Sequence, residues 1–192
     1  AAGKDYKVNP GDGAFYGPKL DFHVKDSLGR VWQCGTIQLD MNLPERFDLT
    51  YVAANGEKVR PVMLHRVIFG SIERFIGILI EHFAGAFPLW LAPTQVKVIP
   101  VKNEYHLDYA KEVFALLNEN NIRVEMDDRE EKLGYRIREA QMKKIPYQLV
   151  LGDSERDNKT VTYRHYGQQQ QTTVSLEEFV SMLKNEIASK GK

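Results

Sequence analysis

The sequence has one cysteine, no net charge and no long apolar run, and each shortage excludes a class of protein. Cys34 alone cannot form an internal disulfide, which indicates a reducing compartment. No stretch approaches the roughly 18 apolar residues of a membrane span, because the apolar segment 75–80 is followed by Glu81 and His82. The N-terminal residues show no secretory signal, so we expect a cytoplasmic protein without a membrane partner. The 26 basic and 26 acidic residues cancel, so a nucleic-acid partner needs a local basic patch.

Two patterns of predicted elements meet near residue 91 and indicate two domains, 1–91 and 92–192. The first pattern predicts mixed-polarity strands and then one helix, at 17–25, 30–40, 48–52, 59–69 and 71–84. In the second, strands at 95–101, 122–126, 147–151, 160–165 and 172–174 alternate with helices at 105–118, 132–143 and after the capping box 175–178. The fold class is therefore α+β with an antiparallel sheet, followed by a small α/β domain with a mixed sheet.

A basic cluster lies in or beside the predicted helix 132–143. It consists of Arg136, Arg138, Lys143 and Lys144. One interpretation is a solvated helix face, and the other is a surface for nucleic-acid phosphates.

Arg74 has an unusual place at the start of the predicted helix 71–84. Ser71 suits the N-cap, which puts Arg74 near the third helical position, where the helix dipole disfavours a cation. An anion held at this helix start by backbone N–H groups and the guanidinium would explain the arginine. A solvated arginine on the polar face is the alternative.

The chain resembles the C-terminal part of the bacterial threonyl-tRNA synthetase family, within the class II aminoacyl-tRNA synthetases. The segments that carry this resemblance are residues 13–19 (GAFYGPK), 32–40 (WQCGTIQLD) and 61–77. Residues 131–139, 145–147 and 152–153 resemble the anticodon-binding domain shared by the threonyl, prolyl, histidyl and glycyl enzymes. The resemblance implies the end of a class II catalytic domain followed by an anticodon-binding domain.

By this resemblance the function is that of a threonine–tRNA ligase. ATP with Mg²⁺ activates threonine as an adenylate, and the threonyl group passes to tRNA(Thr), in an enzyme that is a homodimer at full length. The family holds a zinc ion with one cysteine and two histidines, and His65 matches the last of these ligands. On residue pattern alone, a single histidine on a strand is more often a core residue with its hydrogen bonds made inside the protein than a metal ligand.

The resemblance also assigns nucleotide contacts. Arg74 matches the arginine that contacts ATP and has a catalytic role, and Ser71 lies at the same helix start. Lys19 is the second residue with a predicted catalytic role, and Tyr16 is a further active-site position near the first strand.

On the second strand, Gln33 and Gln38 match nucleotide- or substrate-contacting glutamines, and Thr36 is a further candidate. The two glutamines have opposite parity, so both face the site only if the strand bulges between them. Gly35 is a suitable place for that bulge.

In the second domain, Glu155 and Arg164 match family residues that read anticodon bases. A carboxylate accepts from base amino groups and an arginine donates to base acceptors, and unstacked RNA loops offer such edges. Arg136 and Arg138 are candidates for phosphate contacts.

The first two class II signatures and two zinc ligands of the family would lie upstream of residue 1. We therefore expect that this chain alone does not activate threonine, and that His65 alone does not hold zinc tightly. The alternative function is a non-catalytic RNA-binding fragment or accessory module that recognises an anticodon-like hairpin.

Overall fold

The computed structural model describes residue 3 and residues 5–191. The chain divides into two compact units, Ala1–His82 and Phe83–Lys192. Residues 83–91, which we assigned to the first domain, lie in the second unit, and the exact domain boundary stays a prediction. No helix in the described part of the chain is long and apolar enough to cross a membrane.

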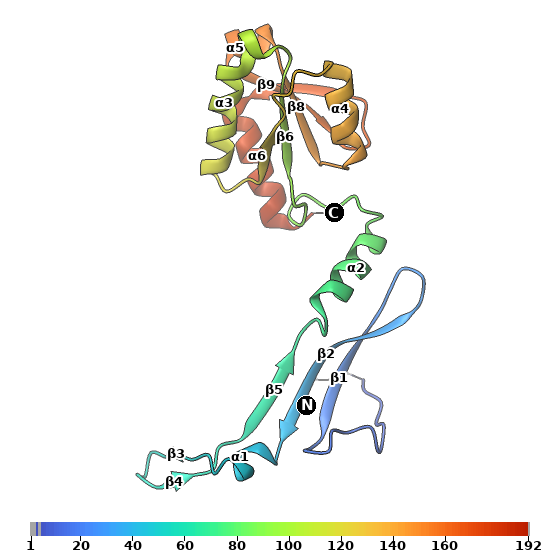
Figure 1. Cartoon of the computed structure of the whole chain (residues 1–192), viewed down its shortest axis with the longest axis vertical. Helices are drawn as coiled ribbons and strands as arrows, with labels where there is room; N and C mark the ends of the chain where they lie inside the picture. The colour runs from blue at the N-terminus through green and yellow to red at the C-terminus, as the bar shows by residue number, and fades with distance from the viewer. Residues whose placement is uncertain (1–2, 4, 192) are drawn as a thin grey trace. The chain divides into compact units, whose positions relative to one another are not determined.

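The first unit contains a three-stranded antiparallel sheet in the order β1-β2-β5 (Figure 1). Its strands are β1 (Lys19–Lys25), β2 (Val31–Asp40) and β5 (Met63–Val67). The helix α2 (Ile72–His82) follows β5. The turn between β1 and β2 closes when the N–H of Gly29 donates to the carbonyl of Asp26 at 3.0 Å, and the φ of +83° at this position suits glycine.

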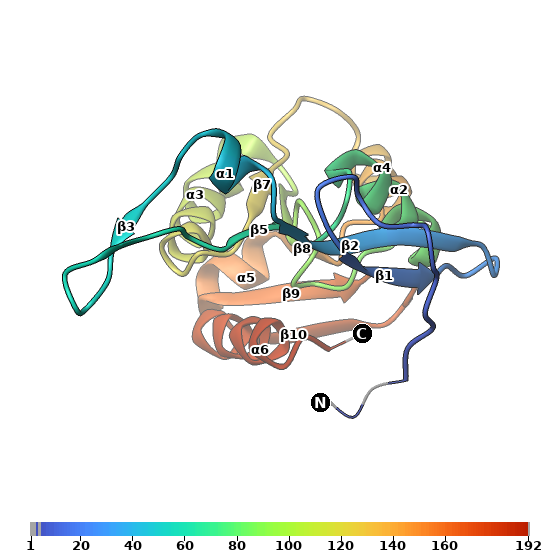
Figure 2. The same cartoon turned by 90° about the horizontal axis from the view of Figure 1, so that it is seen from below.

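The predicted strands 48–52 and 59–69 were wrong in extent. The segment between β2 and β5 instead forms the four-residue helix α1 (Leu43–Arg46) and a small separate hairpin of β3 (Tyr51–Val52) and β4 (Lys58–Val59) (Figure 2). Pro61 lies between β4 and β5 and has no N–H to give to a sheet ladder, which disfavours continuous pairing at this point.

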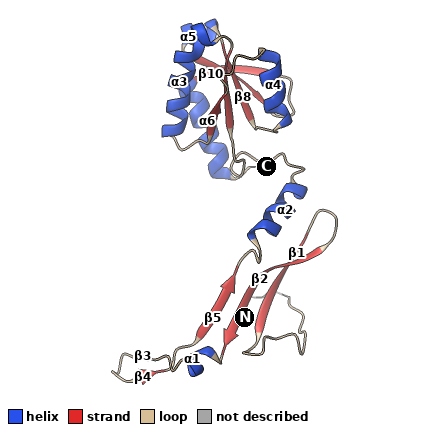
Figure 3. Ribbon diagram, in the orientation of Figure 1, coloured by secondary structure: helices blue, strands red, loops and turns tan. Residues whose placement is uncertain are grey.

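The second unit is a five-stranded mixed sheet in the order β10-β9-β8-β6-β7. The parallel strands are β6 (Val96–Pro100), β7 (Val124–Met126) and β8 (Tyr147–Leu151), while β9 (Thr160–His165) and β10 (Gln171–Ser175) complete the sheet in antiparallel pairing. Four helices accompany it, α3 (Asn103–Glu119), α4 (Leu133–Met142), α5 (Asp153–Asn158) and α6 (Leu176–Ser189) (Figure 3). The predicted α/β pattern is confirmed.

The two faces of this sheet have different coverings. Tyr147, Leu149 and Leu151 of β8 belong to a large core with residues of α3 and α6. On the other face a smaller cluster joins Ala140 of α4 to Ile99 of β6. Figure 1 shows α3 and α6 on one side of the strands and α4 on the other. Side chains alternate along β8, so its even-numbered residues lie on the α4 side.

Two helix starts show how local chemistry sets the boundaries. The Oγ of Ser175 accepts from the N–H of Glu178 at 3.2 Å, as the capping box predicted. Helix α5 was missed, because its six residues are polar and carry no apolar period. Its start is fixed by Glu155, whose Oε2 accepts from the N–H of Gly152 at 2.9 Å.

Candidate functional site

The sheet of the first unit gathers the predicted site residues on one face. Gln38 of β2 is opposed by Lys19 on one side and by His65 on the other, and Asp21 is opposed to Thr36. Because opposed residues in a sheet share a face, all five side chains project in the same direction.

A β-bulge brings Gln33 to the same face. Phe22 pairs with Gly35 while the next residue, His23, pairs with Gln33, so Cys34 is an extra residue without a partner on β1. The predicted bulge between the two glutamines of this strand is thus confirmed, but its extra residue is Cys34 and not Gly35, where the bulge was expected.

Asp21 is the centre of the network on this face. Its carboxylate receives Lys19 Nζ at 2.8 Å, Gln33 Nε2 at 2.7 Å and Thr36 Oγ1 at 2.8 Å. The hydrogen bond from Lys19 is the main cause that lowers the pKa of Asp21, and the same bond raises the pKa of Lys19. The lysine and two uncharged polar groups are therefore held around one ionised carboxylate.

A second acid, Asp40, orients His65. Asp40 Oδ2 lies 2.7 Å from His65 Nε2, and Oδ1 accepts from the N–H groups of Asn42 at 2.8 Å and Leu43 at 2.9 Å. Burial opposes ionisation of Asp40, but these hydrogen bonds outweigh it and its pKa lies below the ordinary value. An ionised Asp40 accepts a hydrogen bond from the Nε2–H of His65. This leaves Nδ1 as the acceptor or ligand atom.

Tyr16 closes this end of the face. Its hydroxyl donates to Gln38 Oε1, and its ring lies edge-on to the imidazole of His65 at 5.8 Å between centroids. Tyr16, Gln38 and His65 thus form one contiguous cluster, as expected for three residues assigned to the same active site.

The described residues contain one candidate zinc ligand, His65, without others beside it. No group of three or more His, Cys, Asp or Glu side chains in the described residues is placed to hold a metal ion. His65 contributes a single nitrogen, and its carboxylate neighbour Asp40 is engaged by backbone N–H groups. The described residues therefore supply one candidate ligand, His65, and do not complete a zinc site by themselves.

Arg74 reaches back from α2 to strand β2. It is the third residue of the helix, and its N–H donates to the Oγ of Ser71 at 3.3 Å, so the predicted cap and position are confirmed. Its Nη2 donates to the carbonyl of Gln33 at 2.6 Å, and its guanidinium lies 5.9 Å from the ring centroid of Trp32. Gly70 leaves room for this path, since a Cβ there would stand 2.5 Å from Nη2. The arginine is exposed but attached beside the polar face.

Asp21 and Asp40 are the residues that sequence reasoning did not select for the site. Both share strand parity with selected residues, Asp21 with Lys19 and Asp40 with Gln38. That parity was the available signal. However, a half-exposed strand also has acidic residues on its solvent face, so the sequence pattern does not distinguish a solvated carboxylate from one at the centre of a hydrogen-bond network.

In the second unit, the predicted base-reading residues lie around the α4 side of β9. Glu155 Oε1 accepts from Thr162 Oγ1 at 2.6 Å, and that hydroxyl is also 2.7 Å from Thr173 Oγ1. Arg164 is two residues beyond Thr162 on β9 and therefore shares its face. The Nε of Arg164 is buried and has no hydrogen-bond partner.

The structure gives Arg136 a different role from the predicted phosphate contact. Its side chain is buried, with 3% exposure, and it donates to the carbonyls of Asp127 at 2.8 Å and Pro100 at 2.9 Å. It ties the end of β6 to the segment after β7. Arg138 is exposed and stays a candidate for phosphate.

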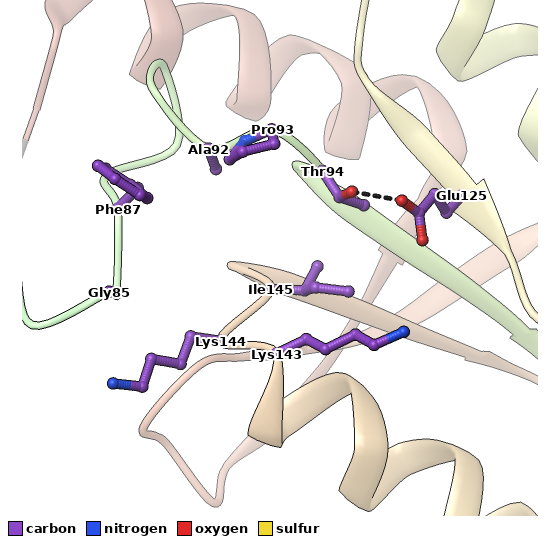
Figure 4. Close-up of a pocket in the computed structure, with 9 residues that line it drawn as sticks. All are labelled: Gly85, Phe87, Ala92, Pro93, Thr94, Glu125, Lys143, Lys144 and Ile145. Carbon is purple, nitrogen blue, oxygen red and sulfur yellow. Dashed lines mark hydrogen bonds between the residues drawn. The ribbon is translucent and has the colours of Figure 1, made fainter. Parts of the chain in front are cut away.

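The two lysines of the predicted basic cluster line a small cleft of about 230 Å³. Lys144 donates to the carbonyl of Ala84, and Figure 4 shows the side chains of Lys143 and Lys144 extending in opposite directions. On the opposite wall, Glu125 accepts from Thr94 at 2.6 Å, the main cause that lowers its pKa. The carboxylate in this cleft therefore already has a hydrogen-bond donor. The two lysines point apart, so the basic cluster does not form one continuous surface.

Comparison with known proteins gives a consistent result for both units. The family model "tRNA synthetase class II core domain (G, H, P, S and T)" matches residues 4–83, and the model "Anticodon binding domain" matches residues 95–186. The threonine–tRNA ligase of Clostridium novyi (strain NT) is 63% identical over 189 residues, which are 98% of this chain. Nearly the whole chain therefore corresponds to the C-terminal part of threonine–tRNA ligases.

The match to threonine–tRNA ligases covers the C-terminal part of these relatives. The chain spans 30% of the length of the C. novyi protein and 29% of the Clostridium botulinum (strain Hall) protein, to which it is 61% identical over 188 residues. It is also similar to the crystal structure of the RNA binding domain of threonyl-tRNA synthetase from Cryptosporidium parvum Iowa II. The TM-score is 0.84 at 39% identity, over 96% of this chain and 46% of that one. The predicted fold class, a class II core segment followed by an anticodon-binding domain, is confirmed.

Proposed function

We propose that this chain supplies two working parts of a threonine–tRNA ligase, a portion of the active-site face and the anticodon-reading domain. Its substrates would be threonine, ATP with Mg²⁺ and tRNA(Thr), in a homodimeric enzyme. The observation that carries the proposal is the convergence of Tyr16, Lys19, Gln33, Thr36, Gln38 and His65 on one sheet face, with Arg74 attached beside it.

In the activation step, Arg74 would offset negative charge on the phosphates of ATP as pyrophosphate leaves. Its hydrogen bond to the carbonyl of Gln33 fixes the guanidinium beside the face where Gln33 and Thr36 share Asp21. This arrangement holds the donors in place before substrate arrives, so little reorganisation is needed during the reaction. His65 would serve as one ligand of the zinc ion, through the nitrogen that Asp40 leaves free.

The active-site part is tested in a chimera, because the chain spans only 30% of the C. novyi relative. This chain would replace the corresponding C-terminal part of that enzyme, and threonine-dependent pyrophosphate exchange would be measured. We expect an active chimera in which Arg74→Ala lowers exchange by roughly 100-fold. Arg66→Ala is the matched control, since Arg66 is opposed to Ile37 on the other face of the same sheet. Equal rates for the two variants would contradict the proposed role of Arg74.

In RNA recognition, Arg164 and Glu155 would contact anticodon bases and Arg138 a phosphate. This part is tested on the chain itself with tRNA(Thr) and the same tRNA carrying a scrambled anticodon, at fixed near-physiological salt because phosphate contacts depend on ionic strength. We expect at least tenfold tighter binding of the native anticodon, about 1.4 kcal/mol. Equal binding would contradict the assignment and favour an RNA contact without anticodon specificity.

A further inference from the structure

Gln148 occupies the centre of the second sheet. It lies on β8, where its register partners are Lys97 of β6 on one side and Arg164 of β9 on the other. Only 1% of Gln148 is exposed, and neither Oε1 nor Nε2 has a hydrogen-bond partner. Both ends of a buried amide are therefore unsatisfied.

A second buried glutamine in the same unit shows the usual solution. Gln95 is also 1% exposed, but its Nε2 donates to the carbonyl of Leu89 at 2.8 Å and its Oε1 accepts from the N–H of Arg123 at 2.9 Å. Buried polar groups in native proteins are nearly always paired in this way, because an unpaired one loses its hydration without compensation. Gln148 departs from this rule in both atoms, so both are available to a partner from outside the chain.

The neighbouring arginine has the same property. Arg164 Nε is buried without a partner on the strand position opposite Gln148, and this donor does not bond to Gln148 Oε1. Together the two side chains offer an amide donor, an amide acceptor and a guanidinium donor at adjacent positions of one sheet face. They share that face with Thr162, which bonds to Glu155.

The mixed set of donors and acceptors limits the ligand. A phosphate has only acceptor oxygens and would leave Gln148 Oε1 unpaired. The edge of a nucleobase carries a donor and an acceptor side by side, and glutamine and asparagine pair with such edges through both amide atoms. Unstacked bases of an RNA loop present these edges freely.

We propose that Gln148 is a base-reading residue of the anticodon-binding surface. When RNA binds, the Arg164 side chain turns outward to the RNA, and the edge of one unstacked base pairs with both amide atoms of Gln148. This inference rests on the proposed anticodon-reading function and adds a residue that determines specificity. The unpaired amide lowers the stability of the free chain and is satisfied in the complex.

The test compares Gln148→Met with Gln95→Met, using synthetic anticodon stem-loops of tRNA(Thr) at fixed salt. Methionine has a similar volume and no unsatisfied polar end, so Q148M should raise the thermal midpoint of the second unit and weaken binding of the native stem-loop at least tenfold. Q95M should lower the midpoint, because it leaves the Leu89 carbonyl and the Arg123 N–H unpaired, and should leave RNA affinity unchanged.

Single-base replacements in the stem-loop identify the base that is read. In the original chain one anticodon position should show a clear penalty on replacement, and that penalty should disappear in Q148M. A measurement that needs no variant is the side-chain amide NMR signal of Gln148, which should shift when stem-loop is added while that of Gln95 does not.

Two negative results have different meanings. If the original chain discriminates the native from the scrambled anticodon and Q148M discriminates equally well, this inference is overturned and the proposed function stands. If the original chain does not discriminate, the proposed anticodon reading fails and this inference fails with it.

Discussion

The first unit exposes apolar side chains along its sheet, whereas the second encloses them in a core. In the first, Leu64 of β5 is 61% exposed, and Leu20 and Phe22 of β1 are exposed as well. In the second, Leu149 of the central strand is 0% exposed and packs among residues of α3 and α6. Within the described part of the first unit, the buried apolar side chains are Cys34, Pro44 and Ile78. A sheet of this kind needs another surface to cover it, while the second unit is already complete.

The polar groups show the opposite contrast. In the first unit, Asp21 and Asp40 pair with most of the site side chains before any ligand is present. In the second, Gln148 and the Nε of Arg164 are buried without hydrogen-bond partners at opposed positions of one sheet face. Under the proposed function, the face for chemistry is fixed in advance by internal hydrogen bonds, and the face for recognition leaves hydrogen bonds to its partner.

The largest expected effect concerns independent folding. Residues 83–192 expressed alone should unfold in one cooperative thermal transition, because their core is complete. Residues 1–82 expressed alone should show no cooperative transition in circular dichroism and little amide protection. A sharp transition in the isolated first unit would show that it folds without another surface to cover its sheet.

The next effect compares two leucines on strands of the two sheets. Leu149→Ala should lower the free energy of unfolding of the second unit by about 2–5 kcal/mol, since it opens a cavity in a packed core. Leu64→Ala should change stability by less than about 0.5 kcal/mol, because that side chain is mostly exposed. Urea unfolding of the full chain gives both values, and similar losses would show that the sheet of the first unit is covered in solution.

Two arginines of one helix provide a smaller contrast. Arg136→Ala should cost about 2 kcal/mol of stability, because it leaves the carbonyls of Asp127 and Pro100 without their donor. Arg138→Ala should leave stability nearly unchanged and reduce the salt dependence of tRNA binding by about one phosphate contact. If Arg138→Ala leaves the salt slope of binding as it was, the phosphate assignment is wrong.

The smallest effect is a pH dependence at Asp127. Its carboxylate accepts from Arg129 Nε at 2.8 Å and Nη2 at 2.7 Å, and these bonds are the main cause that lowers the pKa of Asp127. Because the folded-state pKa is the lower one, the stabilisation is complete above the ordinary value of about 4 and is lost as the pH falls through the lowered value. Asp127→Asn should therefore destabilise the second unit at pH 6 and do so less at pH 3. An equal loss at both pH values would argue against the ion pair.

The sequence predicted the second unit better than the first, for a physical reason. The strand Tyr147–Leu151 was predicted with its exact bounds because four of its five residues are apolar or aromatic and turn signals flank it. The strand expected at 59–69 failed because β propensity continued on both sides of Pro61, although the proline interrupts the ladder. The spacing of apolar residues indicates which face of a strand is buried, but it does not indicate where the hydrogen-bonded pairing of the strand ends.

The site was predicted unevenly for similar reasons. A bulge between Gln33 and Gln38 followed from parity, because two glutamines on opposite sides of a strand cannot face one site otherwise. Parity does not fix the position of the bulge, which was expected at Gly35 and lies at Cys34. The phosphate contact expected of Arg136 was wrong, because the sequence does not show that the side chain of a helical arginine donates to the end of a buried strand. The unpaired amide of Gln148 has no signal in the sequence, since it depends on which neighbours fail to reach it.

Gly70 has a consequence for how this segment can change during evolution. Its φ of +71° is left-handed, and a Cβ there would meet the Nη2 of Arg74 as well as the Cys34 carbonyl at 3.2 Å. Positions 70 and 74 are therefore not free to vary separately. A side chain at position 70 would be strained by its backbone conformation and would displace the guanidinium, so glycine at this position preserves the contact of Arg74 with β2.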